Sequence, residues 1–94
     1  MFEWDQEKAA RNLSKHSVPF AEAATVFGDL GALTFLDPDH SMTELRFITI
    51  GFSTRGRLLF VAHADRNERT RIISARPTTK LEAKQYAEIH RASR

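Results

Sequence analysis

The stretch K-A-A-R-N-L-S-K-H, residues 8 to 16, carries side chains that could hold a phosphate and move a proton. Two lysines, an amide and an imidazole follow one another at spacings of four, seven and eight residues from the first: Lys8, Asn12, Lys15 and His16. These spacings place them on one side of an α-helix, with Ala9 and Leu13 on an opposite, apolar side for a core. His16 ends the segment, where the negative end of the helix dipole favours a cation that could donate a proton. The polar side is therefore either a working surface or an ordinary solvated face.

Two arginines bracket the apolar stretch I-I-S-A further along the chain, Arg71 and Arg76. An arginine beside so much apolar sequence needs a carboxylate partner or a place at the margin of a sheet. We therefore expect Arg71 to form an ion pair with a helix carboxylate such as Glu7 or Glu22. Arg76 directly precedes Pro77 at the end of a predicted strand, where its guanidinium can face solvent and a phosphate.

The remaining histidines and a short acidic motif are weaker candidates. His63 lies in an otherwise apolar segment and is expected to be a core histidine with one hydrogen-bond partner. His90 lies near the end of the last predicted helix and is expected to be solvated. The motif D-P-D-H, residues 37 to 40, contains metal-ligating types, but Asp and Pro form turns by themselves, so we interpret it as a solvated turn. No metal site and no cofactor are predicted.

Cations and a histidine suit one reaction in particular, the cleavage of RNA without a metal ion. That reaction must activate a 2′-hydroxyl, stabilise the charge on the phosphorus in the transition state and protonate the leaving 5′-oxygen. Lysine and arginine can stabilise the charge, and histidine can supply the proton. The residues alone support this reaction only weakly, because any basic surface would satisfy the same requirements. No glycine-rich phosphate loop or G-x-S-x-G motif indicates another enzyme class.

Length and composition predict one globular domain, residues 1 to 94. A chain of 94 residues cannot support two cores, and 28 % charged residues are ordinary for a soluble protein. The absence of cysteine excludes disulfides, thiolate metal sites and a cysteine nucleophile. The apolar runs are too short to span a membrane, and the first residues, M-F-E-W-D, are acidic rather than a basic signal region. We therefore expect a cytoplasmic protein.

The charge divides unevenly along the chain. Residues 1–54 hold four Lys and Arg against eight Asp and Glu, whereas residues 55–94 hold ten against four. Most of the cations in the second half are arginine, whose planar guanidinium suits phosphate and carboxylate. A polyanion or an acidic protein therefore fits as a partner, and a solvated basic face is the alternative.

The first third of the chain predicts two helices. Asp5 is a good N-cap for a helix over residues 6–16. Pro19 suits a first helical turn, and the apolar spacing that follows predicts a second helix over residues 20–27, closed by Gly28 and Asp29. Residues 2–4 are expected to be extended and could add a short N-terminal strand.

The rest of the chain predicts four strands and a closing helix. β-Type runs over residues 32–36, 44–52, 57–64 and 69–76 are separated by short turns, so these strands should form an antiparallel meander. The last helix is expected over residues 78–90, with Thr79 and Glu82 in capping-box register. The predicted fold is therefore α+β, with helices over one face of the sheet.

Alternation assigns the strand residues to faces without showing which face the helices cover. In the strand over 69–76 it separates two sets: Thr70, Ile72, Ser74 and Arg76 on one side, and Arg71, Ile73 and Ala75 on the other. In the strand over 57–64 it places Leu59, Val61 and His63 together, opposite Leu58, Phe60 and Ala62. Neither face of these strands is clearly polar, so both faces could be partly covered.

The order and spacing of these motifs closely resemble the BrnT family over nearly the whole chain, from Phe2 to about Tyr86. The most specific stretches are W-D-x-x-K-x-x-x-N-x-x-K-H and I-I-S-A-R, supported by L-x-F-x-D-P-D-H and E-x-R-F-x-T-I-G. One departure is Pro19, which stands where a serine-like helix cap is expected. It alters a cap and not the polar motif.

The resemblance implies a RelE-like fold and a ribonuclease toxin of a type II toxin-antitoxin pair, which cleaves RNA and stops translation. It implies a ribbon-helix-helix antitoxin of the BrnA type, a two-fold toxin-antitoxin heterotetramer, and binding of operator DNA only through the antitoxin. The residues then expected to act in catalysis are His16 as general acid or base, Lys15 and Arg76 on the phosphate charge, and Arg71. Those expected to bind RNA are Lys8, Asn12, Arg57 and Lys80.

Two other functions stay open at this point. The chain could be a non-catalytic module whose basic half binds an antitoxin or RNA. Direct binding of DNA is less favoured, because no recognition helix with clustered base-reading residues is visible.

Overall fold

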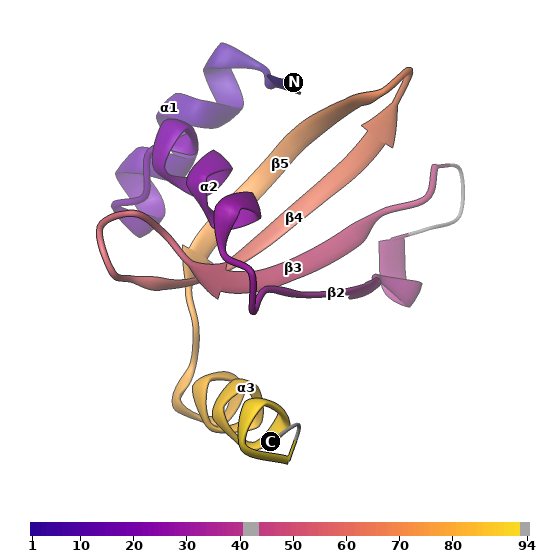
Figure 1. Cartoon of the computed structure of the whole chain (residues 1–94). Coiled ribbons are helices and arrows are strands. Elements are labelled where there is room, and N and C mark those ends of the chain that lie inside the picture. Colours follow the sequence, from indigo (N-terminus) through magenta and orange to yellow (C-terminus); the bar gives the residue numbers. More distant parts are fainter. Residues whose placement is uncertain (41–43, 93–94) are drawn as a thin grey trace.

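The computed structural model describes residues 1–40 and 44–92, and Figure 1 shows their arrangement. In chain order the elements are β1 (Phe2–Glu3), α1 (Gln6–His16), α2 (Phe20–Thr25), the 3₁₀ turn η1 (Val26–Gly28), β2 (Leu33–Leu36), the 3₁₀ turn η2 (Pro38–His40), β3 (Phe47–Phe52), β4 (Leu58–Arg66), β5 (Arg69–Pro77) and α3 (Lys80–Ala92). Within these residues the fold is α+β, with three α-helices and a five-stranded mixed sheet, so the predicted class is confirmed. No helix of the described ranges is long and apolar enough to cross a membrane.

The sheet has the strand order β1-β5-β4-β3-β2. Strands β2 to β5 form the predicted antiparallel meander, and β1 joins its end by pairing in parallel with residues 70 and 71 of β5. The strand predicted from residue 44 begins only at Phe47. Glu44 lies outside the sheet ladder, and its carboxylate forms an ion pair with Arg66 at the end of β4.

The first helix has the predicted bounds, and the second is shorter than predicted. Asp5 caps α1 by accepting a hydrogen bond from the Glu7 N–H at 3.1 Å. Ser17 ends it in the left-handed region at φ 58°, a turn of the chain that leads directly into α2. The Thr25 hydroxyl donates to the Glu22 carbonyl at 2.6 Å, and from residue 26 the chain continues as the tighter turn η1.

The main core lies between these two helices and one face of the sheet. Its fully buried members are Val18, Phe20, Ala23, Val26, Leu59, Val61, Ile72 and Ala75. Leu59 and Val61 thus face the helices together, as alternation in β4 predicted. Leu13 was predicted to face the core from α1, but its side chain is 50 % exposed. Of the predicted apolar side of α1, only Ala9 packs against the core.

A β-bulge in β5 breaks the alternation predicted for that strand. Ala62 pairs with Ser74 but His63 pairs with Ile72, so Ile73 is an extra residue without a counterpart on β4. Ile72 and Ala75 consequently both enter the helix-facing core, although simple alternation put them on opposite faces. The bulge leaves Ile73 and Ser74 half-buried beside α1.

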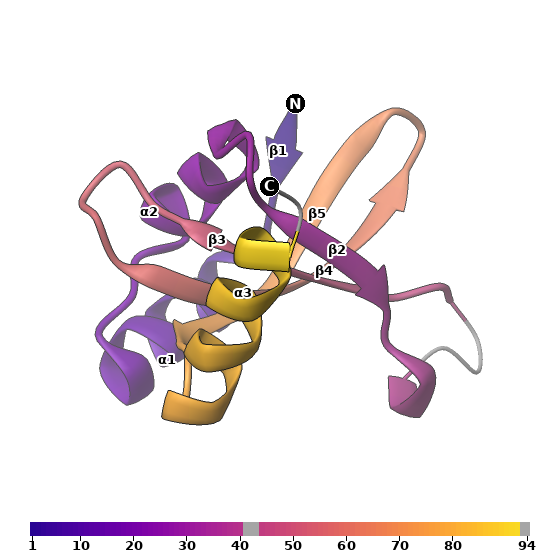
Figure 2. The ribbon, with the colours of Figure 1, turned by 60° about the horizontal axis from the view of Figure 1, so that its bottom comes forward.

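The third helix covers one end of the other face of the sheet, as Figure 2 shows, so the helices do not all lie over one face as predicted. Tyr86 forms a second core cluster with Ile48 and Ile50, against which Leu58, Phe60 and Ala62 pack. The predicted capping box is confirmed, because the Glu82 N–H donates to the Thr79 hydroxyl at 3.2 Å and the Thr79 N–H donates to the Glu82 carboxylate at 2.8 Å.

Polar contacts hold α3 to the segment before β2. The Asp29 carboxylate accepts hydrogen bonds from the Tyr86 hydroxyl at 2.9 Å and from the Phe52 N–H at 2.8 Å. Burial and this carboxylate raise the pKa of Tyr86 to about 12. His90 was predicted to be solvated, but it lies against Gly31, with its Nε2 2.6 Å from the Gly31 carbonyl oxygen. A Cβ at position 31 would lie 2.7 Å from the His90 ring, so a larger residue there would displace this side chain.

His63 is a core histidine with one hydrogen-bond partner, as predicted. It is 3 % exposed, and its Nε2 lies 2.8 Å from the Thr49 hydroxyl. Its ring packs between Phe27 and Phe47, with centroid distances of 4.9 and 5.8 Å. Burial lowers the pKa of His63 below its ordinary value of 6.5, although the Asp65 carboxylate, 3.4 Å from Nδ1, acts in the opposite direction.

The stability of the fold should therefore decrease as the pH falls below about 6.5, because the unfolded chain then binds a proton that the buried His63 does not accept. The free energy of unfolding, measured by denaturant titration between pH 7.5 and 5.5, should decrease in the wild type and change much less in His63→Gln. The lowered pKa values of Glu22 and Asp29 affect the free energy of unfolding only at lower pH, because the ordinary pKa values of these carboxyls are 4.5 and 3.8.

Ser14→Ala is the control, since Ser14 is exposed and has no titratable side chain, and it should keep the pH dependence of the wild type. If His63→Gln kept the full pH dependence, protonation of a group other than His63 would be responsible.

Candidate active site

A hollow between α1 and β5 brings together the polar residues that the sequence placed on one side of the first helix. It has a volume of about 290 Å³ and is lined by Lys8, Arg11, Asn12, Lys15 and His16 from α1 and by Ile73 and Ser74 from β5. The three cationic side chains are exposed, and the imidazole of His16 is half-buried at the last turn of the helix. The four residues grouped by their spacing thus line one hollow, and the bulged part of β5 forms its opposite wall.

Arg11 is a member of this site that the sequence reasoning missed. It lies three residues after Lys8 and four before Lys15, so helical periodicity places it on the same side. Its guanidinium is 3.9 Å from the Glu7 carboxylate, and both side chains are mostly exposed, so this pair contributes little to stability. Arg11 therefore adds a third cation to the hollow.

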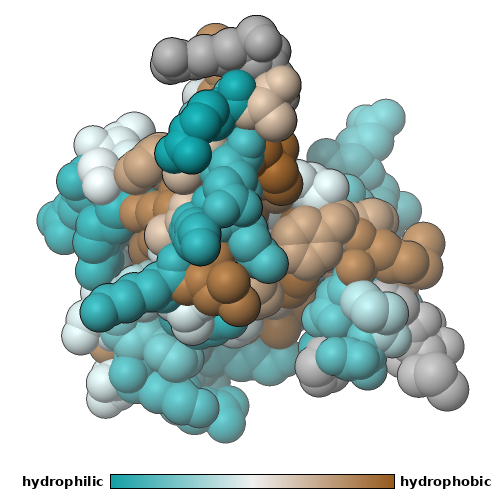
Figure 3. Space-filling model, turned by 90° about the horizontal axis from the view of Figure 1, so that it is seen from below, coloured by the Kyte–Doolittle hydropathy of each residue, from teal (hydrophilic) through white to brown (hydrophobic). Residues whose placement is uncertain are grey.

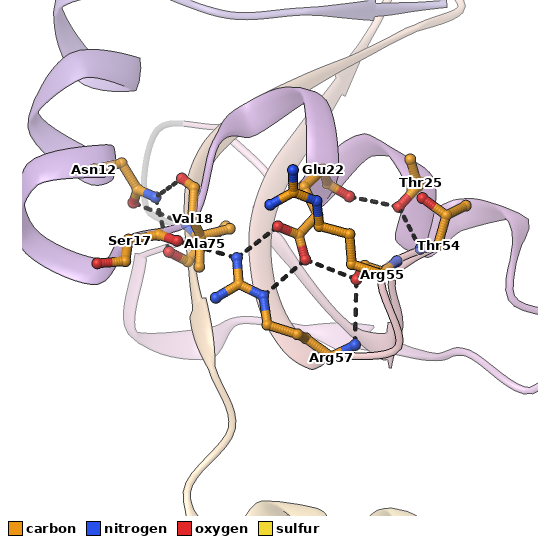
Figure 4. Close-up of polar contacts among 10 residues, drawn as sticks. Asn12, Ser17, Val18, Glu22, Thr25, Thr54, Arg55, Arg57 and Ala75 are labelled. Atoms are coloured by element: carbon orange, nitrogen blue, oxygen red, sulfur yellow. Dashed lines mark hydrogen bonds and ion pairs between the residues drawn. The ribbon is translucent and has the colours of Figure 1, made fainter.

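Asn12 fixes the position of α1 against the sheet, as the close-up in Figure 4 shows. Its side-chain NH₂ donates to the carbonyls of Ala75 at 2.8 Å and Val18 at 2.9 Å, and its Oδ1 accepts from the Ala75 N–H at 3.0 Å. The residue is only 6 % exposed. Its amide groups are thus engaged by the backbone, and the contact with RNA predicted from the sequence stays a prediction.

Arg57 lies outside the hollow and is the partner of a buried carboxylate. Its Nε donates to Glu22 Oε2 at 2.9 Å, and its Nη2 donates to Glu22 Oε1 and to the Ser17 carbonyl (Figure 4). The Ser53 hydroxyl also donates to Glu22, at 2.7 Å. The hydrogen bonds from Arg57 hold the pKa of Glu22 below its ordinary value of 4.5 despite its burial. Arg57 therefore ties the β3–β4 turn to the start of α2.

Arg71 has a different partner from the one predicted. Its guanidinium lies 3.1 Å from the carboxylate of Glu3 on β1, which also attracts Arg69 at 3.6 Å. Neither Glu7 nor Glu22 is its partner, because Glu7 lies along the exposed side of α1 and Glu22 is bound by Arg57. The parallel pairing of β1 with β5 brings Glu3 opposite Arg71.

Arg76 lies on the face of the sheet that α3 partly covers, and its side chain has protein partners. Its guanidinium forms two hydrogen bonds with the Glu82 carboxylate, at 2.8 and 2.9 Å, and lies 4.0 Å from the centre of the Phe60 ring. These bonds hold the pKa of Glu82 below its ordinary value. Lys80, the first residue of α3, is exposed and does not line the hollow beside α1.

The D-P-D-H segment forms a turn, as predicted. Residues 38–40 make the 3₁₀ turn η2, and the Asp39 N–H donates to the Asp37 carboxylate at 3.2 Å. The side chain of His40 lies outside the described part of the structure. In that described part, no group of three or more histidine, aspartate and glutamate side chains lies close enough to hold a metal ion.

Comparison with known proteins connects this arrangement to one family. The family model described as "Ribonuclease toxin, BrnT, of type II toxin-antitoxin system" matches residues 4–82. The fold is similar to the 1.1 Å crystal structure of the ribonuclease toxin BrnT from Brucella abortus, with a TM-score of 0.65 and 24 % sequence identity over 85 % of this chain and 99 % of that chain. At this identity the second match shows the fold alone. No curated protein matches.

The contacts of Asn12 predict a structural defect when it is replaced. Asn12→Ala leaves three buried backbone groups of Ala75 and Val18 without partners, so the free energy of unfolding should decrease by about 3 kcal/mol in a denaturant titration. Asn12→Asp should be destabilising as well, because its carboxylate can accept from the Ala75 N–H but cannot donate to the two carbonyls.

The exposed neighbour Ser14 provides the control, and Ser14→Ala should stay within about 0.5 kcal/mol of the wild type. An Asn12→Ala variant of unchanged stability but weaker RNA binding would instead support the direct contact predicted from the sequence.

Proposed function

Because the chain belongs to the family of BrnT ribonuclease toxins of type II toxin-antitoxin systems, we propose that it cleaves RNA without a metal ion and thereby stops translation. The observation that carries this proposal is the hollow beside α1, where the half-buried His16 and three cations line one cavity. A phosphodiester placed there would meet cations for its charge and an imidazole for proton transfer.

The chemistry needs two proton transfers and one charged transition state. The 2′-oxygen loses a proton and attacks the adjacent phosphorus, and the bond to the 5′-oxygen breaks as that oxygen gains a proton. In the proposal, His16 takes or gives one of these protons. Lys15, one residue earlier on α1, stabilises the charge on the phosphoryl oxygens, and Lys8 and Arg11 bind the neighbouring backbone phosphates.

Arg76 is proposed as a further cation for the phosphate, held in place by Glu82. The two bonds to Glu82 fix the plane of the guanidinium and leave some of its five N–H groups for another acceptor. We also propose that Lys80, exposed at the start of α3, contacts the RNA backbone. Like Arg76, Arg57 and Arg71 are each bound by a glutamate, and their roles toward RNA stay predictions.

The partner proposed for this toxin is a ribbon-helix-helix antitoxin. Membership of a type II toxin-antitoxin family implies an antitoxin, and we propose that the two proteins form a two-fold heterotetramer in the cytoplasm that binds operator DNA through the antitoxin. We also propose that the fold is of the RelE type.

An apolar hollow of about 260 Å³ on the other side of α1, lined in part by Trp4, Leu13 and Pro19, supports a protein partner. The same hollow favours the second candidate function, a binding module without catalysis.

Cleavage of a labelled single-stranded RNA in excess EDTA tests the catalytic proposal. The purified wild type should cleave it, and the cleavage rate should fall about 100-fold or more in His16→Ala and about 10-fold in Lys15→Ala. Lys84→Ala, which changes an exposed lysine of α3 next to Glu88, should cleave at the wild-type rate. A folded wild type that does not cleave, or cleavage unaffected by His16→Ala, would contradict the assignment of His16.

Growth and antitoxin binding separate the two candidate functions. Expression of the wild type should arrest growth, and co-expression of the antitoxin should restore it. His16→Ala should permit growth and still bind the antitoxin with wild-type affinity, because His16 lies on the opposite side of α1 from the apolar hollow. If the wild type binds the antitoxin tightly but never affects growth, the binding module is the better description.

A further inference from the structure

A second hollow lies on the face of the sheet that α3 partly covers, and it adjoins the hollow beside α1. It has a volume of about 450 Å³, and the two hollows share Ile73 and Ser74 as lining residues. The extra residue in β5 therefore lies at the junction between them. A chain bound along the cations of α1 could pass directly over this junction onto the sheet.

The second hollow is mainly apolar, and it includes an aromatic ring that is open to solvent. Phe35 on β2 lies opposite Ile48 on β3, and the two line the hollow together with Phe60 and Ala62. Phe35 is 48 % exposed, whereas Phe60 is half-buried and has Arg76 over its ring. Figure 3 shows that apolar side chains reach the surface on both sides of α3, on the side of the molecule where this face of the sheet lies.

Polar side chains also line the second hollow, which distinguishes it from a purely apolar contact surface. Arg46, Asp37 and Asp39 also line the hollow, and Ser74 adds a hydroxyl at the junction. Together with the flat ring of Phe35 and the cations of the adjoining hollow, these groups match the way in which proteins bind single-stranded nucleic acids. Cations follow the backbone, aromatic side chains stack on bases, and polar groups contact the base edges.

Building on the proposed ribonuclease function, we propose that this second hollow binds a nucleobase of the RNA, stacked on Phe35, while the neighbouring phosphate lies among the cations of α1. The site is a base-binding subsite and takes no part in the bond-breaking step. Phe35 is thus a positioning residue, and the polar side chains of the hollow give the protein a preference for the base at this one position.

Binding of a short single-stranded RNA, measured by fluorescence anisotropy, tests the role of the ring. Phe35→Ala should weaken binding about 10-fold, which is the order of one base stacked on an aromatic side chain. Phe35→Trp should retain wild-type affinity, whereas Phe35→Leu should bind as weakly as the alanine variant, because it keeps the apolar volume but has no flat ring.

Leu36→Ala is the matched control. Leu36 is the next residue of the same strand, is exposed to a similar extent at 47 %, and pairs with Phe47 so that it faces the other side of the sheet. It should bind RNA with wild-type affinity. Thermal unfolding of each variant shows whether a loss of binding reflects a loss of folding.

An RNA series with a single abasic nucleotide at successive positions identifies the stacked base. For the wild type, one position should lose about 10-fold in affinity when its base is absent. For Phe35→Ala, removal of that same base should cost little, because its stacking partner is already gone.

The outcomes distinguish this subsite from the ribonuclease function itself. If the wild type binds and cleaves RNA but Phe35→Ala does the same, or the abasic effects persist in Phe35→Ala, the subsite is wrong and the function stands. If Phe35→Ala loses affinity only for the antitoxin, the hollow is a protein-docking site and the subsite is wrong. If the wild type neither binds nor cleaves RNA, both proposals fail together.

Discussion

The cavity between α1 and the sheet depends on one buried amide. Among the described residues, β1 pairs only with residues 70 and 71, and the edge of β5 beyond them has no strand partner. Asn12 occupies that edge as a neighbouring peptide group would, accepting from the N–H of Ala75 and donating to its carbonyl. Its third bond, to the Val18 carbonyl, fixes the turn after the helix. Because the same helix carries the lysines and His16, this amide determines where they lie relative to the bulge in β5.

Part of the uneven charge of the sequence is neutralised by ion pairs that join the two halves of the chain. Acidic residues of the first half bind arginines of the second half: Glu3 with Arg69 and Arg71, Glu22 with Arg57, and Glu44 with Arg66. The basic second half is thus less a surface for a polyanion than its composition indicated, since these guanidiniums join distant segments of the chain. The proposed RNA surface relies mainly on cations of the acidic first half, on α1, with Arg76 and Lys80 added from the second half.

Local patterns predicted the features that short segments determine, and failed where distant segments meet. The bounds of α1 follow from Asp5 and the apolar spacing, and the capping box of α3 from Thr79 and Glu82, because caps and periodicity act within a turn of helix. The bulge at Ile73 gave no signal, since an extra residue in a strand leaves the sequence pattern unchanged. The burial of Asn12 depends on Ala75, 63 residues away, and the docking of His90 on Gly31, 59 residues away. The cluster on α1 was predictable as a surface, but its opposite wall was not.

The long separation between Asn12 and Ala75 also has a consequence during synthesis. The ribosome makes α1 before β5, and the two meet only in the folded chain. The hollow cannot form until residue 75 has been added and has left the ribosome, because until then α1 has no strand edge to bind. All residues between α1 and residue 75 must therefore be translated before the cations and His16 can share a cavity with β5, so the nascent chain carries the residues of α1 long before it carries the site.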